Sequence, residues 1–225
     1  MTRHMDREVG KLKKHILSLS AMVEDRVQRA VESFSTRDDK LAACIIDEDN
    51  DVDQMEVDIE EECLKLLALY QPVAIDLRFV IAVLKINNDL ERIGDEAVNI
   101  AERALYLAQH EPVGIHFDFT EMTAKTQVML RHSLDSLVSL DPALAREVGA
   151  SDDEVDDLNR LIYLQVQQAM SQHPEKVEQL IHYLSISRHL ERIADYATNI
   201  AEDVVYMIEG EIVRHKPEVF KTHKA

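Results

Sequence analysis

Apolar residues recur every three or four positions along most of the chain, which is the spacing of one face of an α-helix. The first such run includes Leu12, Ile16, Leu19, Val23 and Val27. Short polar or proline-containing segments interrupt the pattern, for example at residues 35–39 and at Pro72. The pattern predicts an all-α fold, with helices at about residues 6–34, 40–69, 74–110, 119–140, 142–172 and 174–210.

Several segments of the sequence occur twice, once in each half of the chain. Residues 90–102 read LERIGDEAVNIAE, and residues 190–202 read LERIADYATNIAE. Upstream, residues 49–53 match residues 152–156, and a segment with a proline and a glycine, residues 111–114, separates the copies. We therefore predict two tandem three-helix bundles related by a pseudo-two-fold axis, with residues 1–111 in the first and residues 116–225 in the second.

Two helix ends have clear signals. Asp141 followed by Pro142 is typical of an N-cap and the first helical position, and Gly210 is typical of a helix C-terminus. The tail after Gly210 is basic, and we expect it to be less ordered.

Composition narrows the possible functions. The chain has 25 Lys and Arg against 43 Asp and Glu, so its net charge is −18, which disfavours binding to the phosphates of DNA or RNA. Only 5 Gly and 5 Pro are present, which argues against β-rich and Rossmann folds. With no apolar run of membrane length and no signal core, we expect a cytoplasmic protein. Cys44 and Cys63 each have apolar neighbours, and we expect both to be buried.

Acidic and amide side chains form stripes beside the apolar faces. At about 100° per residue, Glu91, Asp95 and Asn99 lie on one side of their helix, and Asp49 and Asp53 lie on one side of the preceding helix. If these two helices pack antiparallel, the stripes face each other across a groove. The second half repeats the arrangement, except that Tyr163 takes the position of Glu60. The candidate ligands are Asp49, Asp53, Glu91, Asp95 and Asn99, and then Asp152, Asp156, Glu191, Asp195 and Asn199.

Carboxylates at four-residue spacing repel each other by a few tenths of a kcal/mol per pair, roughly, so something must offset the charge. Arg92 and Arg192 adjoin the stripes and could do so. A cation is the other explanation, and oxygen ligands suit Mg²⁺, Ca²⁺, Mn²⁺ or iron. A solvated acidic face is the alternative. The stripes, however, occur on both helices of a pair and again in the second half, and this repetition favours a metal site. We interpret His189, beside the second stripe, as a surface residue or a neighbour of the ligands.

Asp76 and Arg78 follow Pro72 at the start of a predicted helix. They could belong to a simple turn and helix start. They could equally form a partner-binding contact at the end of the bundle.

Residues 69–104, LYQPVAIDLRFVIAVLKINNDLERIGDEAVNIAERA, resemble the signature of the PhoU family, and residues 186–207 resemble its second copy. The resemblance implies two similar three-helix bundles and a cytoplasmic negative regulator of phosphate uptake and of the phosphate-starvation regulon. It implies two partners, the ATPase subunit of the phosphate ABC transporter and the phosphate-sensing histidine kinase. It also implies metal ions (iron, Mn, Mg or Zn) on E(D)xxxD motifs. Here these are Glu91/Asp95 and Glu191/Asp195, with Asp49/Asp53 and Asp152/Asp156 as facing pairs.

We therefore expect a non-catalytic adaptor, because the sequence has no nucleophile–base motif and no glycine-rich phosphate loop. Two alternatives stay open: a multinuclear carboxylate metalloenzyme, and a helical scaffold whose acidic grooves bind a basic partner. We also expect a homodimer, since long amphipathic helices often leave an apolar strip exposed, and membrane association only through partners.

Overall fold

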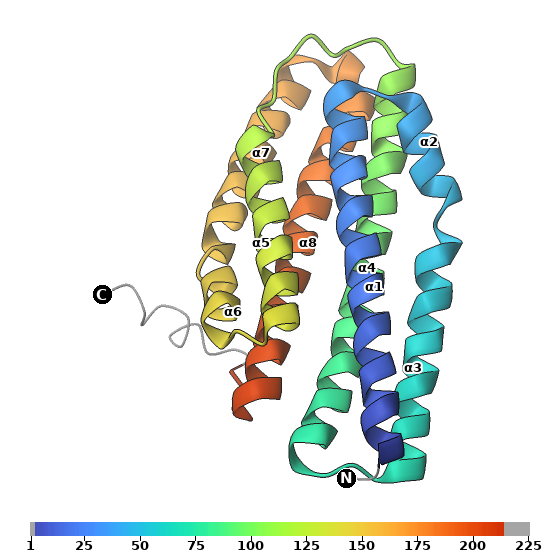
Figure 1. Ribbon diagram of the computed structural model, residues 1–225. Helices are drawn as coiled ribbons and strands as arrows, with labels where there is room; N and C mark the ends of the chain where they lie inside the picture. The colour runs from blue at the N-terminus through green and yellow to red at the C-terminus, as the bar shows by residue number, and fades with distance from the viewer. Residues whose placement is uncertain (1–2, 214–225) are drawn as a thin grey trace.

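The computed structural model describes residues 3–213, and all regular structure in that range is helical (Figure 1). The prediction of an all-α bundle is confirmed. The first half contains α1 (Arg3–Thr36), α2 (Asp39–Asp47), α3 (Asn50–Tyr70) and α4 (Ala74–Gln109). The second half contains α5 (Thr120–Ser139), α6 (Pro142–Gly149), α7 (Asp152–Gln172), a 3₁₀ turn (Pro174–Lys176) and α8 (Val177–Glu209).

The two halves share one plan: a first helix, a short helix of 8 or 9 residues, a helix of 21 residues and a long last helix. The last helices of each half, α4 and α8, pack along each other through the centre of the molecule (Figure 1). Helices α1, α2 and α3 cover α4, while α5, α6 and α7 cover α8. The duplication seen in the sequence is therefore a duplication of structure.

The core lies on the apolar faces of α4 and α8, beside the acidic stripes. Four aliphatic side chains of α4 are fully buried, and so are their four counterparts on α8: Leu90, Ile93, Ala97 and Ile100, and Leu190, Ile193, Ala197 and Ile200. Fully burying one large aliphatic side chain stabilises a fold by about 1.5–3 kcal/mol. These two helices consequently form the rigid centre on which the acidic side chains are arranged.

The expected second and fifth helices are each divided, which corrects the sequence prediction of continuous helices at 40–69 and 142–172. The first break lies at Glu48 and Asp49, and the second lies at Ala150 and Ser151. At the first break, a guanidinium N–H of Arg26 on α1 donates to the backbone carbonyl of Glu48. Apolar periodicity continues across the break, so the pattern could not reveal a contact made by a distant helix.

The predicted helix ends are confirmed. The carboxylate of Asp141 accepts hydrogen bonds from the backbone N–H groups of Ala143 and Leu144, with Pro142 inside the first turn. Gly210 ends α8 in the left-handed conformation, at φ 77°. Most of the tail after Gly210 lies outside the described residues, so the expectation about its order stays a prediction.

The two cysteines differ. Cys63 is fully buried, as predicted. The prediction for Cys44 is wrong, because this residue is exposed on α2, where its thiol contacts Glu48 and Arg29. Within residues 3–213, none of the helices is both long and apolar enough to cross a membrane.

Candidate metal centre

The first acidic cluster forms where the start of α3 crosses the middle of α4. Asp49, Asp53 and Asp95 each present a carboxylate oxygen, and these three atoms lie within 4.8 Å of one another. Metal–oxygen distances of about 2.0–2.6 Å place the ligand oxygens of one cation about 3–5 Å apart. The three carboxylates therefore fit a single oxygen-coordinated cation.

Glu91 and Glu56 border this cluster. Burial raises the pKa of Glu91, and the charges of Asp95 and Asp53 raise it further. The pKa of Glu56 is also raised, first by burial and then by Glu60 and Asp53. Since Asp53 on α3 acts on Glu91 of α4, the two stripes face each other as the sequence predicted.

The carboxylates at the centre of the cluster experience the same repulsion. Burial raises the pKa of Asp49, and the charge of Asp53 adds to the rise. Burial likewise raises the pKa of Asp95, followed by the charges of Asp49 and Asp53. A cation between these groups would relieve the repulsion that each of them shows.

Two arginines of α1 bind the break between α2 and α3, Arg26 through Asp49 and Arg29 through Glu48. Arg26 is 4% exposed, and its Nη1 lies 3.1 Å from Oδ1 of Asp49. Arg29 forms a 2.6 Å ion pair with Glu48, and hydrogen bonding by Arg29 lowers the pKa of Glu48 to about 2. The break in the helix therefore positions the first ligand of the cluster.

Gly94 allows α3 to approach α4 closely at this point. A Cβ atom at residue 94 would lie 3.2 Å from Cγ1 of Val52 and 3.8 Å from Nη1 of Arg26. Val52 lies between Asp49 and Asp53 in the sequence, so this close approach sets the distance of both carboxylates from Asp95. The duplicate has Ala194 at the matching position.

The second acidic cluster has the same residues in a looser arrangement. Burial raises the pKa of Asp195 to about 7, and the charges of Glu191, Asp152 and Asp156 contribute. Burial and then the charge of Asp156 raise the pKa of Glu191. The two stripes thus face each other here too. Among the described residues, however, three carboxylate oxygens approach one another within 4.8 Å only in the first half.

Other side chains engage members of the second cluster. Oγ1 of Thr198 donates to Oδ1 of Asp152 at 3.2 Å, whereas the first half has Val98 at that position. Oγ of Ser187 donates to Oδ1 of Asn159 at 2.6 Å, and Tyr163 is 49% exposed. The hydroxyl of Thr198 engages Asp152, and Tyr163 stands where the first half has the carboxylate of Glu60. The second site is therefore less compact and less acidic than the first.

The remaining predicted residues lie at the edges. Asn99 and Asn199 are half-buried one turn beyond Asp95 and Asp195. Asp76 and Arg78 lie in the first turns of α4, where the guanidinium of Arg78 packs beside Gly210 at the end of α8. Arg78 thus joins the ends of α4 and α8, and its partner-binding role stays a prediction.

A buried ionic contact between α4 and α8 was not predicted from the sequence. Glu96 is 2% exposed and interacts with both His189 and Arg192 of α8. His189 therefore contacts the first half rather than a ligand of the second cluster. Helical rotation puts Glu96 at the edge of the apolar face, which is the signal that could have marked it as buried and paired.

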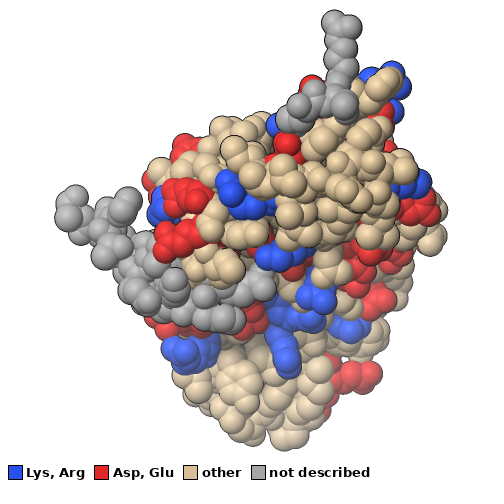
Figure 2. Space-filling view, turned by 90° about the horizontal axis from the view of Figure 1, so that it is seen from below, with Lys and Arg blue, Asp and Glu red and all other residues tan. Residues whose placement is uncertain are grey.

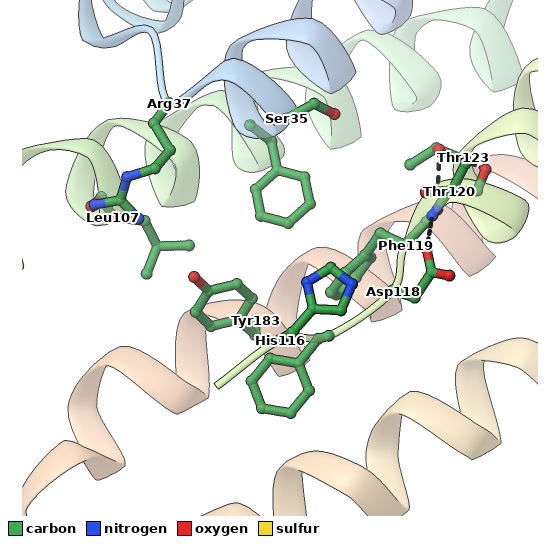
Figure 3. A pocket seen from close by; sticks show the side chains of 11 residues that line it. Ser35, Arg37, Leu107, His116, Asp118, Phe119, Thr120, Thr123 and Tyr183 are labelled. Atoms are coloured by element: carbon green, nitrogen blue, oxygen red, sulfur yellow. Dashed lines mark hydrogen bonds between the residues drawn. The ribbon is translucent and has the colours of Figure 1, made fainter. Parts of the chain in front are cut away.

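A separate cavity of about 490 Å³ lies near the linker between the halves. Figure 3 shows aromatic and polar side chains from both halves around it, including Phe119, Tyr183 and His116. Arg37 at its rim donates to the backbone carbonyls of Leu107 and His110. These bonds join the end of α4 to the turn after α1, which is a structural role.

Comparison with known proteins identifies relatives across almost the whole chain. A family model described as "PhoU domain" matches residues 16–104 and 119–204. The phosphate-specific transport system accessory protein PhoU homolog of Aquifex aeolicus is 37% identical over 210 residues, which are 93% of this chain and 95% of that protein. The homolog of Pseudomonas aeruginosa is 34% identical over 96% of this chain and 89% of that protein.

Solved structures agree with this result. The crystal structure of PhoU from Pseudomonas aeruginosa superposes with a TM-score of 0.89 at 33% identity, covering 92% of this chain and 99% of that one. The phosphate transport system regulatory protein PhoU from Streptococcus pneumoniae gives a TM-score of 0.82 at 30% identity, over 93% and 99% of the two chains.

Replacing Gly94 with Ala should push α3 away from α4, and so move Asp49 and Asp53 away from Asp95. The added methyl group meets Val52, so the gain in helix propensity, about 1 kcal/mol, is offset by the steric conflict. Gly10→Ala on α1 is the matched control, because nothing lies within 4 Å of its Cβ. Urea unfolding should show Gly10→Ala stabilised by about 0.5–1 kcal/mol and Gly94→Ala at least about 1 kcal/mol less stable than this control. Equal stabilisation by the two substitutions would contradict the close approach.

Asp195 should make the metal-free protein less stable as pH rises. Its folded pKa of about 7 exceeds its ordinary value of 3.8. Between pH 3.8 and about 7, the folded state therefore binds a proton that the unfolded state has released. The free energy of unfolding therefore falls as pH rises through that window. At pH about 8 with a chelator, Asp195→Asn should be more stable than wild type by about 1 kcal/mol, discounted for partial exposure. Asp157→Asn, an exposed residue of α7, is the control; a pH profile unchanged by Asp195→Asn would refute the assignment.

Proposed function

The chain belongs to the PhoU family, and from this membership we propose that it is an accessory protein of a phosphate-specific transport system. The observation that supports the proposal is the length of chain that matches. The family model matches both halves, and the relatives named for this role align over more than nine-tenths of the chain.

We propose that the protein acts in the cytoplasm as a non-catalytic adaptor. It binds the ATPase subunit of the phosphate ABC transporter and the phosphate-sensing histidine kinase. When phosphate is plentiful, it keeps phosphate uptake and the phosphate-starvation regulon repressed. The family resemblance supports these partners, and the protein is expected to work as a homodimer.

An apolar surface at the α3–α4 end supports a role in protein contacts. Leu69, Val73 and Ile75 are 74%, 73% and 67% exposed around the loop that joins α3 to α4. Figure 2 views this end of the molecule, where uncharged surface forms broad patches between charged groups. Exposed apolar groups gathered in this way are typical of binding surfaces.

We further propose that Asp49, Asp53 and Asp95 hold a cation (iron, Mn, Mg or Zn), with Glu91 at the edge of the site, and that the second cluster holds one more weakly. The ion supplies positive charge that offsets repulsion between the helices. Three convergent carboxylate oxygens support this proposal, and so do the raised pKa values of Asp49 and Asp95.

Removing two carboxylates should abolish cation binding at the first cluster. Asp53→Asn combined with Asp95→Asn keeps the side-chain shapes and removes two negative charges. Mn²⁺ titration by calorimetry should show one fewer tight site than wild type. The matched control, Asp51→Asn with Asp58→Asn on exposed positions of α3, should bind like wild type. Unchanged stoichiometry in the first variant would refute the site.

Changing the apolar end should impair partner binding without unfolding the bundle. Val73→Ser with Ile75→Ser should weaken capture of the transporter ATPase subunit or the kinase by roughly tenfold, while stability changes by about 0.5 kcal/mol or less at these exposed positions. Val57→Ser with Leu64→Ser, elsewhere on α3, is the control.

The experiment uses both partners from the same organism at near-physiological salt. Wild-type protein that captures neither partner would rule out the adaptor function. Binding that persists unchanged in a chelator would favour the scaffold alternative, in which cations have no part in recognition.

A further inference from the structure

A small apolar groove lies where the first turns of α1 and α4 meet the end of α5, and we call it the α1–α5 groove. Its volume is about 70 Å³. One water molecule needs roughly 10–15 Å³ of such space, so the groove has room for one large side chain. The apolar residues that line it are Ile16, Leu17, Phe79, Leu137, Val138 and Leu140.

The second half has apolar residues in this groove at positions where the first half has polar ones. The capping residues Asp38 and Asp141 align the two halves, because each accepts hydrogen bonds from the backbone N–H groups two and three residues later. Two positions just before these caps differ in character between the halves. The matched pairs are Ser35 with Val138, and Arg37 with Leu140.

Leu140 is unfavourable for the isolated protein in two ways. It is 47% exposed, and its backbone is left-handed at φ 55°, a conformation that glycine and asparagine adopt more readily. The matching Arg37 has the same backbone conformation, but its side chain donates hydrogen bonds to the backbone carbonyls of Leu107 and His110. An aliphatic side chain cannot make such bonds, so contact with an apolar partner is the use that Leu140 offers.

Two lysines bring positive charge to the groove. Lys13 lines it, with Nζ 5.2 Å from the centroid of the Phe79 ring, and Lys14 is exposed beside it on α1. Among the described residues, neither lysine forms an ion pair, whereas the nearby Lys11 pairs with Glu8. In a chain of net charge −18, this local positive charge is an exception, and it is complementary to an acidic partner.

The groove continues the apolar surface at the α3–α4 end. Ile75 is 67% exposed on that surface, and Phe79 of the groove lies four residues later on α4, so both face the same side of the helix. Figure 2 shows this end of the molecule, with Lys and Arg side chains grouped between areas of uncharged surface. One partner can therefore contact the apolar end and the groove together.

We propose that the α1–α5 groove binds an acidic segment of a protein partner. The segment inserts a large apolar side chain beside Leu140 and places its carboxylates next to Lys13 and Lys14. A concave groove suits an inserted side chain better than a flat bilayer, and the negative charge of the whole chain repels anionic lipids. This inference rests on the proposed adaptor function and adds the chemistry of the segment that docks.

Reversing the two lysine charges tests the electrostatic part of the proposal. With Lys13→Glu and Lys14→Glu combined, the Kd for the transporter ATPase subunit or the kinase should rise roughly tenfold or more. The difference from wild type should shrink as salt is added, because exposed charges are screened. Lys40→Glu with Arg160→Glu is the control. It changes the net charge equally at exposed positions of α2 and α7, and should leave the Kd within about threefold of wild type.

Replacing Leu140 with Asn tests the apolar part. Asparagine tolerates the left-handed backbone, so the melting temperature should change by less than about 4 °C, while the Kd for the same partner rises roughly tenfold. Leu161→Asn, which removes a 51% exposed leucine of α7, is the control and should bind the partner like wild type. A lower melting temperature with unchanged partner binding would show that Leu140 serves only the bundle.

The results separate this inference from the adaptor function. Wild-type protein that captures neither partner would overturn the adaptor function and the role of the groove with it. Capture that both groove variants leave unchanged would overturn the groove alone. Binding to phosphatidylglycerol vesicles that the lysine variant loses, with partner capture intact, would reassign the groove to a membrane. Self-association lost in Leu140→Asn, with partner capture intact, would reassign it to a second copy of the chain. Should Leu140→Asn not fold, the lysine variant decides alone.

Discussion

Two rows of carboxylates can lie side by side in this protein because apolar side chains directly beneath them hold the helices together. Val52 and Ile59 of α3 and Leu90 and Ile93 of α4 are all at most 1% exposed. Each such burial contributes about 1.5–3 kcal/mol, whereas a like-charged pair on a helix surface costs a few tenths of a kcal/mol, roughly. The apolar contacts therefore dominate. The raised pKa values of the carboxylates are a consequence of packing, and they leave a concentrated negative site on a stable frame.

The duplication preserved this frame while the details of the two clusters diverged. Gly94 lets α3 approach α4, whereas the second half has Ala194, and its carboxylates do not converge as closely. Arg26 brings a positive charge to Asp49, while in the second half the neutral hydroxyl of Thr198 bonds to Asp152. The matching ligands Asp49 and Asp152 thus have different partners, a charged guanidinium in the first cluster and a neutral hydroxyl in the second. The same motif consequently produces two sites of different geometry and charge.

The fold was largely predictable because helical periodicity and helix caps are local signals. The apolar faces of α4 and α8, the cap at Asp141 and the end at Gly210 all follow from spacing and residue type. The division of the second helix was not predictable, since Arg26 reaches Glu48 from another helix. For the acidic clusters, the spacing identified the stripes that face each other. Which carboxylates converge depends on the approach of two helices, and that distance is set by packing at Gly94.

The contact between α4 and α8 shows why charged residues persist in a core that apolar residues could fill. Lys85 pairs with buried Asp203 at 2.8 Å, and Glu96 pairs with Arg192. Replacing such pairs with apolar groups is often neutral or stabilising, so net stability does not explain them. Similar aliphatic residues repeat along both helices, and a slip of one turn, about 5.4 Å, would still bury apolar surface. It would, however, separate Glu96 from its partners and leave a buried charge unpaired, which costs about 3–5 kcal/mol. The ion pairs therefore fix the register of α4 against α8, and this register determines where each acidic cluster lies relative to the other.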